Sequence, residues 1–92
     1  MEFEWDQRKD AANRRKHGVS FYDAQRAFLD SERIIAIDAK HSTVKETRYF
    51  CFGTVEEKVM TVRFTMRAEK IRIFGAGYWR EGRRRYEKEK RI

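Results

Sequence analysis

The sequence predicts an α+β fold, in which an antiparallel β-sheet of about four strands and a short N-terminal strand pack with two N-terminal helices and a C-terminal helix. Three observations support this class. The chain has 92 residues, 40% of them hydrophobic, which suits a single domain over 1–92 with one modest core. Four runs between residues 33 and 75 alternate apolar and polar side chains, as strands do. Helix-capping residues precede these runs, and strong helix formers follow them.

The first segment predicts a short strand and a polar helix. Phe3 and Trp5 alternate with glutamates, which is typical of a strand with one buried face. Asp6 is a suitable N-cap for a helix that runs to His17 and ends at Gly18. Because this helix offers little apolar surface for core packing, we expect its basic C-terminal residues to serve surface chemistry.

A second helix follows directly. Ser20 and Asp23 form a capping pair at its start. Phe21, Ala24 and Phe28 fall at positions i, i+3 and i+7, which places them on one helix face. This apolar stripe predicts ordinary core packing.

Changes in the spacing of apolar residues predict the sheet and the last helix. Strands are expected over 33–38, 46–53, 58–66 and 70–75, joined as an antiparallel meander with short hairpin turns between the last three. After the final strand, 79–90 contains strong helix formers and one glycine, which predicts a closing helix.

Alternation within the strands assigns two faces to the sheet. In the third strand, the residues expected to face the helices are Met60, Val62, Phe64 and Met66. The opposite face is expected to present Arg48, Arg63 or Arg72, depending on a register that the sequence leaves open.

Charge is concentrated at the C-terminus. The chain has 22 Lys and Arg against 15 Asp and Glu, a net charge of +7, which favours a polyanionic partner such as nucleic acid or an acidic protein. The last fifteen residues hold seven basic and three acidic side chains, interleaved with aromatic ones. Such a segment binds phosphates and stacks on bases, or forms a solvated helix with local ion pairs.

Several kinds of site are disfavoured. Cys51 has no disulfide partner and suits a small buried hydrophobe, and His17 and His41 add too few ligands for structural zinc. Residues 75–77 lack the spacing of a phosphate-binding loop, and no serine has a nucleophile motif. Residues 56–57 fit a solvated turn. We expect no metal, no cofactor, no membrane association and a cytoplasmic location.

Arginine chemistry remains as the candidate activity. Arg67, Arg72 and Arg80 lie where strand ends converge, and guanidinium groups stabilise the charge that develops when an RNA 2′-hydroxyl attacks its own phosphate. The candidates for proton transfer are His17, Lys16 and Tyr86. The candidates for RNA binding are Lys16, Arg48, Arg63, Trp79, Arg83 and Arg84. A purely structural alternative for His17 is a favourable interaction with the helix dipole.

A set of short motifs in fixed order extends over nearly the whole chain. They are Phe3-Glu4-Trp5-Asp6, Asn13, Lys16-His17-Gly18-Val19-Ser20-Phe21, Ala24, Phe28-x-Asp30, Glu46-x-Arg48-Tyr49 with Gly53, Arg67, and Ile71-Arg72-Ile73. Together they resemble the BrnT family of toxins from bacterial type II toxin–antitoxin systems.

The resemblance implies a RelE-like fold and a metal-independent ribonuclease that halts translation. It also implies neutralisation by a cognate BrnA-like ribbon-helix-helix antitoxin, within a homodimer or hetero-oligomer. Toxin and antitoxin together would repress their own promoter, so that promoter DNA is contacted indirectly, through the antitoxin.

One stretch departs from the family pattern. Family members commonly follow the last strand with Ser-Ala-Arg and later a Glu, whereas this chain has Gly75-Ala76-Gly77 and, near the Glu position, Arg83. Either Arg80 supplies the phosphate contact, or the chain is a non-catalytic module that binds RNA or an antitoxin. A third alternative is direct DNA binding by the final helix.

Overall fold

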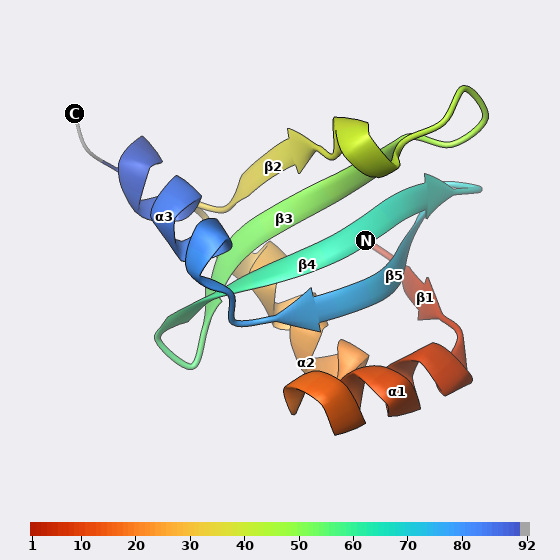
Figure 1. Cartoon of the computed structure of the whole chain (residues 1–92), viewed down its shortest axis with the longest axis horizontal. Helices are drawn as coiled ribbons and strands as arrows, with labels where there is room; N and C mark the ends of the chain where they lie inside the picture. The colour runs from red at the N-terminus through yellow and green to blue at the C-terminus, as the bar shows by residue number, and fades with distance from the viewer. Residues whose placement is uncertain (91–92) are drawn as a thin grey trace.

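A computed structural model of the chain describes residues 1–90. Five strands form one sheet in the order β1-β5-β4-β3-β2, with helices on both faces (Figure 1). The strands are β1 (Phe3–Trp5), β2 (Ile34–Ile37), β3 (Arg48–Val55), β4 (Lys58–Arg67) and β5 (Lys70–Gly77). The helices are α1 (Gln7–His17), α2 (Phe21–Ala24) and α3 (Arg80–Glu89), with 3-10 turns η1 (Gln25–Leu29) and η2 (Ala39–His41).

The predicted α+β class is confirmed, but the sheet is mixed. Strands β2 to β5 form the expected antiparallel meander. The N-terminal strand β1 pairs in parallel with β5, with Phe3 opposite Ile71, and so closes one edge of the sheet. Expected and observed boundaries of the sheet strands and the last helix agree to within two residues.

Both N-terminal helices begin as predicted. The Asp6 carboxylate accepts from the Arg8 N–H at 2.8 Å, and Gly18 ends α1 in the left-handed region with φ 68°. The Ser20 hydroxyl accepts from the Asp23 N–H at 3.0 Å. The second helix is shorter than expected, because the chain tightens into the 3-10 helix η1 before it reaches Phe28, which is nevertheless buried.

The core lies between one face of the sheet and the layer formed by α1, α2 and η1. Its members include Phe21, Met60, Val62 and Ile73, all nearly inaccessible to solvent. Met66, expected on the same face, is 48% exposed near the end of β4. Cys51 is fully buried, and burial raises the pKa of its thiol to about 12, which confirms its expected place as a small hydrophobe.

A bulge between β4 and β5 shapes the opposite face. Arg63 pairs with Gly75, but the next residue, Phe64, pairs with Ile73, so Phe74 is the extra residue. Phe64 and Ile73 remain in the core, while Phe74 joins the arginines on the other side of the sheet.

Helix α3 covers one end of that opposite face (Figure 1). Gly82 lies so close to β3 and β4 that a Cβ on it would collide with the Thr61 hydroxyl and contact the Phe52 ring. Within residues 1–90, the buried Thr61 Oγ1 has no hydrogen-bond partner. In residues 1–90, no helix covers the remainder of this sheet surface, which we call the open face. Its long side chains include Arg48, Arg63, Arg72 and Phe74.

Two tight turns connect the central strands. Glu56 and Glu57 join β3 to β4 with φ angles of 54° and 66°, and Ala68 and Glu69 join β4 to β5 with 51° and 65°. Two successive left-handed residues make the tight hairpin turns that match strand twist. The solvated turn expected at residues 56–57 is therefore confirmed, with glutamates in positions that favour Asn and Gly.

Candidate active site

The open face brings together the three arginines whose register the sequence left unresolved. Arg48 and Arg72 flank Thr65 in one row of cross-strand partners, and Arg63 lies two residues before Thr65 on β4. The guanidinium carbons of Arg48 and Arg63 lie 4.4 Å and 5.2 Å from the centre of the Phe74 ring. These are cation–π distances, so Phe74 holds both guanidinium groups on this surface.

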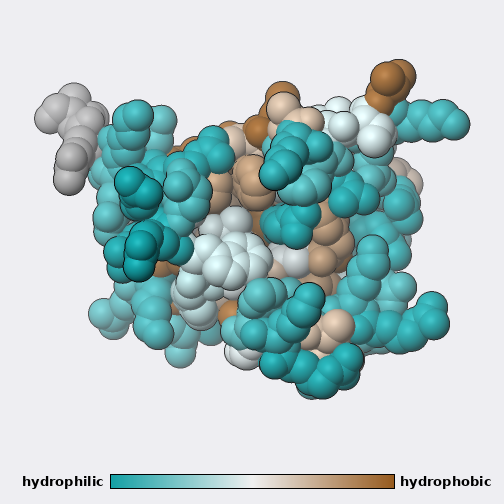
Figure 2. Space-filling model, in the orientation of Figure 1, coloured by the Kyte–Doolittle hydropathy of each residue, from teal (hydrophilic) through white to brown (hydrophobic). Residues whose placement is uncertain are grey.

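A groove of about 320 Å³ runs between α1 and β5 at the border of the open face, and we call it the α1–β5 groove. Its lining residues are Lys9, Ala12, Asn13, Lys16, His17, Arg63, Phe74, Gly75 and Trp79. Three cations and a histidine line it, and no carboxylate is among the lining residues. Figure 2 shows pale and brown atoms over the middle of this view, with hydrophilic side chains around them. The groove therefore combines positive charge with aromatic surface.

Buried polar contacts hold α1 beside the groove. The Asn13 amide donates to the carbonyls of Val19 and Ala76 at 2.9 Å each, and its oxygen accepts from the Ala76 N–H at 3.2 Å. The Asp10 carboxylate accepts from the Phe21 N–H at 2.8 Å. These bonds explain how a helix with little apolar surface is fixed against the sheet, with its basic residues placed at the groove.

Two aromatic rings form the end of the groove. The rings of His17 and Trp79 meet edge to face, with centroids 5.1 Å apart and planes at 90°. The indole also lies against Gly77, where a Cβ would approach Trp79 Cε2 to 2.5 Å. The Trp79 side chain can therefore occupy this place only because residue 77 is glycine. The sequence did not predict this relationship.

Ion pairing separates the arginines of the open face into two groups. Arg72 pairs with Glu4 of β1 at 3.1 Å, and Arg48 pairs with Glu46 at 2.9 Å. Among residues 1–90, no carboxylate pairs with Arg63. Arg63 is thus the guanidinium whose charge remains available to an anionic ligand in the groove.

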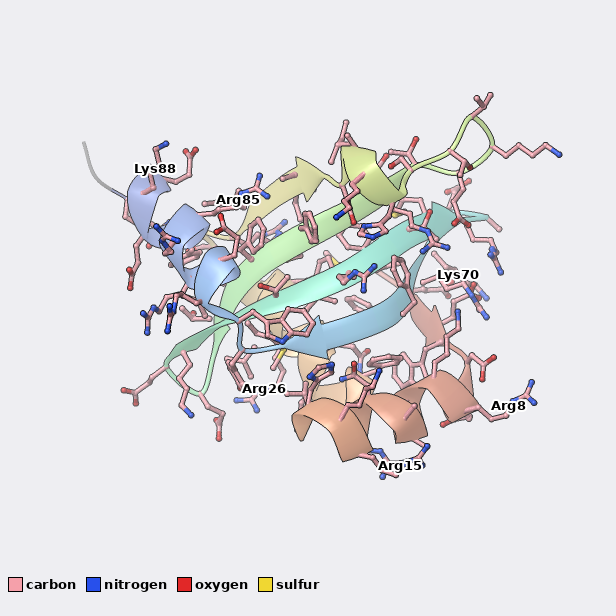
Figure 3. All side chains as sticks on the ribbon, in the orientation of Figure 1. Arg8, Arg15, Arg26, Lys70, Arg85 and Lys88 are labelled. Atoms are coloured by element: carbon pink, nitrogen blue, oxygen red, sulfur yellow. The ribbon has the colours of Figure 1, made fainter. Side chains whose placement is uncertain are left out.

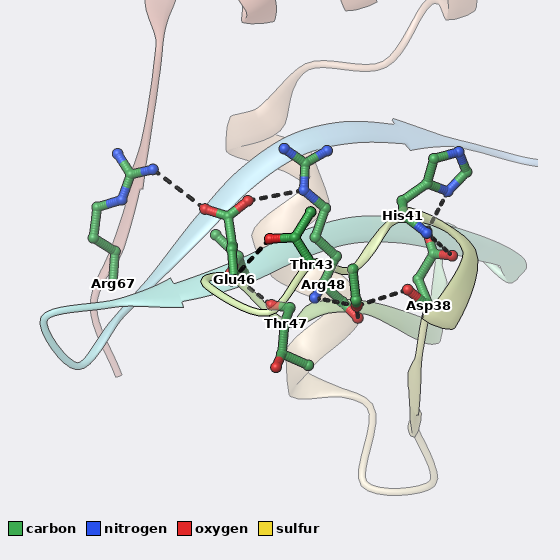
Figure 4. Close-up of polar contacts among 9 residues, drawn as sticks. Asp38, His41, Thr43, Glu46, Thr47, Arg48 and Arg67 are labelled. Carbon is green, nitrogen blue, oxygen red and sulfur yellow. Dashed lines mark hydrogen bonds and ion pairs between the residues drawn. The ribbon is translucent and has the colours of Figure 1, made fainter.

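Glu46 pairs with two of the predicted site residues at once. Its carboxylate bonds Arg48 Nε at 2.9 Å and Arg67 Nη2 at 3.5 Å (Figure 4). The hydrogen bond from Arg48 is the main cause that lowers the pKa of Glu46. In the same view, His41 bonds the buried Asp38 at 2.8 Å, away from the groove.

Arg80 does not converge with Arg67 and Arg72, which lie on the neighbouring strands β4 and β5. Arg67 lies beside the turn that begins β5, whereas Arg80 begins α3 beyond the other end of β5. The strand β5 spans about 23 Å from Lys70 to Gly77, at roughly 3.3 Å per residue. Figure 3 shows the same separation, with Lys70 and Arg85 at opposite ends of the sheet. One phosphate cannot contact both arginines.

Tyr86 lies away from the groove and anchors α3. Its side chain is buried, and its hydroxyl donates to Asp30 Oδ2 at 2.6 Å. Burial, followed by the bond to the Asp30 carboxylate, raises the pKa of Tyr86 to about 12. Among the three residues expected to move protons, only Lys16 and His17 therefore line the groove.

The two remaining candidates lie on exposed turns of α3. Arg84 pairs with Glu81 at 3.8 Å, as a solvated helix face would. Arg83 instead lines a second groove, on the other side of Trp79, together with Arg80. In residues 1–90, no three His, Cys, Asp or Glu side chains gather where they could hold a metal ion.

Phe74, Lys9 and Asn13 belong to the site but were given no role from the sequence. Strand alternation placed Phe74 on the face of Arg72, and Lys9 lies seven residues before Lys16 on the same helix face. Periodicity therefore offered a signal for both. The buried bonds of Asn13 depend on segments distant in sequence and gave no such signal.

The comparison with protein families decides the family. The model of BrnT, the ribonuclease toxin of type II toxin–antitoxin systems, matches residues 5–82. The chain belongs to the BrnT family. The matched span includes every residue of the α1–β5 groove and ends at Gly82, early in α3. A type II toxin family implies an antitoxin partner.

No curated protein matches the chain significantly. In the described part of the chain, no helix is both long and apolar enough to cross a membrane.

Proposed function

We propose that this chain is the toxin of a type II toxin–antitoxin pair and cleaves RNA in the α1–β5 groove. The observation that carries this proposal is the groove itself, which gathers Lys9, Lys16, Arg63 and His17 without a carboxylate and is bordered by aromatic rings. A phosphodiester matches the positive charge, and the rings suit stacking of the adjacent bases.

The chemistry follows from the groups in the groove. Arg63 binds the non-bridging oxygens of the scissile phosphate and stabilises the charge that grows on them. The imidazole of His17 takes the proton from the 2′-hydroxyl, whose oxygen forms a bond to phosphorus. The bond from phosphorus to the 5′-oxygen breaks, and the Lys16 ammonium donates a proton to that oxygen. The products are a 2′,3′-cyclic phosphate and a 5′-hydroxyl.

The fold and partner assignments complete the proposal. The sheet with helices on both faces supports a RelE-like arrangement. We assign the partner as a BrnA-like ribbon-helix-helix antitoxin, which neutralises the toxin and binds promoter DNA for both. Co-purification of the chain with the product of the adjacent reading frame, followed by promoter-binding assays on each protein alone, tests this part. Promoter binding by the isolated toxin would support direct DNA contact by α3 instead.

Metal-independent cleavage is tested directly with purified protein, RNA and excess EDTA. Fragments that end in 2′,3′-cyclic phosphate are expected, and the His17→Ala protein, purified in parallel, controls for contaminating nucleases. Intact RNA, or cleavage that EDTA abolishes, would contradict the proposal.

A non-catalytic binding module is the second candidate, and Gly77 favours it, because the resemblance places an arginine there. Induced expression of the chain without its antitoxin separates the two. Growth arrest that the Arg63→Ala substitution relieves supports the ribonuclease, while unaffected growth supports the binding module.

A further inference from the structure

Trp79 separates two grooves. One is the α1–β5 groove; the other lies between the β3–β4 turn and α3, and we call it the α3 groove. Its lining residues are Glu57, Lys58, Val59, Tyr78, Trp79, Arg80, Arg83 and Glu87. A strand of RNA held in the first groove with a base stacked on the indole would place its next nucleotide in the second.

Charged residues of both signs line the α3 groove. Within residues 1–90, the structure gives no ion-pair partner to Glu57, Lys58, Arg80, Arg83 or Glu87. By contrast, the neighbouring Glu56 pairs with Arg26 at 2.9 Å, and Arg84 pairs with Glu81. Both signs of charge therefore face one cavity without neutralising each other, which suits a ligand that carries donors and acceptors side by side.

The aromatic residues of the α3 groove suit a planar ligand. Tyr78 is 39% exposed, and its hydroxyl donates to the Val55 carbonyl at 3.2 Å, which fixes the ring in place. Lys58 Nζ lies 5.3 Å from the centre of that ring. A base bound on this surface would lie against the Tyr78 ring, with carboxylates and cations near its edges.

We propose that the α3 groove selects guanine in the nucleotide next to the scissile phosphate. Guanine presents the N1–H and N2–H donors on one edge and the O6 and N7 acceptors on another. The carboxylates of Glu57 and Glu87 accept from the first edge, and the guanidinium groups of Arg80 and Arg83 donate to the second. Uracil offers a single N–H between two carbonyls, which repel a carboxylate. This inference rests on the proposed function, since it needs RNA in the adjoining groove.

Binding of non-cleavable RNA tests the inference apart from catalysis. The probes are fluorescein-labelled 2′-O-methyl hexamers of uridine, with the third residue kept or replaced by guanosine, adenosine or cytidine. For the unmodified protein, anisotropy should show the guanosine hexamer binding about tenfold tighter than the uridine hexamer, as expected of a well-formed two-bond contact to a base. The Glu57→Gln/Glu87→Gln protein should lose most of this preference and should bind the uridine hexamer at least as tightly as the unmodified protein does, because two repulsive carboxylates are removed.

A matched control and a second variant complete the experiment. Glu89→Gln changes a glutamate of α3 outside the groove, and this protein should keep the preference for guanosine. Arg83→Ala should weaken binding of the guanosine hexamer more than Arg84→Ala does. Equal binding of all four hexamers, or a preference that survives the double substitution, overturns this inference alone. Absence of binding to every hexamer overturns the inference and contradicts the proposed RNA groove, whereas cleavage in EDTA reports on the proposed function separately.

Discussion

The indole of Trp79 occupies the space that a side chain on Gly77 would need, since a Cβ there would approach Trp79 Nε1 to 3.0 Å and Cε2 to 2.5 Å. The resemblance to BrnT toxins places an arginine at this position, so this chain has a flat aromatic surface where a charged side chain is expected. In the proposed RNA site the cationic contribution comes instead from Arg63, whose side chain lies next to Gly75 in the same groove.

Replacing Gly77 with alanine should displace the indole. We expect RNA affinity to fall about tenfold, because a stacked base contributes roughly 1–3 kcal/mol. Fluorescence anisotropy with a single-stranded RNA measures the change. Tyr22→Ala is the control, since Tyr22 is an exposed aromatic residue outside both grooves. Equal RNA affinities of the Gly77→Ala and unmodified proteins would show that the Trp79 indole does not contribute to RNA binding.

Removal of the imidazole of His17 should slow cleavage by about 10²-fold to 10⁴-fold, the usual contribution of a positioned acid or base. Single-turnover cleavage assays at saturating protein isolate this step from binding. His41→Ala serves as the comparison, because His41 bonds Asp38 outside the groove and should leave the rate unchanged. Similar rates for the two variants would assign His17 a structural role.

Arg63→Ala should weaken RNA binding more than Arg67→Ala, because Glu46 already pairs with Arg67. The logarithm of the binding constant falls with the logarithm of salt concentration by about 0.7 per phosphate contact on a single strand. We expect Arg63→Ala to reduce this slope by about that amount and Arg67→Ala to change it little. The opposite order would move the phosphate site to the β4–β5 turn.

Asn13→Ala should destabilise the fold by about 2–4 kcal/mol, because the buried Val19 and Ala76 backbone groups lose their partners. The free energy of unfolding in urea measures the loss. Arg15→Ala, an exposed change on the same helix, should cost less than about 0.5 kcal/mol. A small effect at Asn13 would mean that water replaces its bonds.

Asp30 should make stability depend on pH in the acid range. Burial raises its pKa, but the hydrogen bonds from Tyr86, Thr54 and Glu32 outweigh burial and lower the pKa from 3.8 to about 2. A depressed folded-state pKa stabilises the protein above about pH 4, and this contribution is lost as the pH falls toward 2. Urea unfolding between pH 2 and 5 should therefore show a shallower pH dependence for Asp30→Asn. Parallel curves would contradict the assignment.

Local signals in the sequence predicted the parts of the fold that local contacts determine. The caps at Asp6, Ser20 and Gly18 and the strand alternation were sufficient for the element order and for the two sheet faces. The parallel pairing of β1 with β5 joins segments that are distant in sequence, and no local pattern specifies it. The ion pair between Glu4 and Arg72, for example, joins residues that are 68 positions apart.

Only some of the predicted site residues come together in the structure. Lys16, His17, Arg63 and Trp79 meet in one groove, as a basic and aromatic nucleic-acid site requires. Arg67 and Arg80 were predicted to lie together because both come after a predicted strand. Successive antiparallel strands, however, end at opposite ends of the sheet. Ion-pair partners such as Glu46 also depend on the register, which the sequence left open.

The two hairpin turns have a consequence for how long the folded protein persists. Four residues with side chains, Glu56, Glu57, Ala68 and Glu69, adopt a backbone conformation that costs about 1 kcal/mol each relative to glycine. The native state is therefore less stable than the same topology permits, and a larger fraction of the molecules is unfolded and open to proteolysis at equilibrium. Asparagine and glycine at these turns would give a longer-lived molecule and leave the α1–β5 groove intact, whereas the change at Glu57 would remove a carboxylate from the α3 groove.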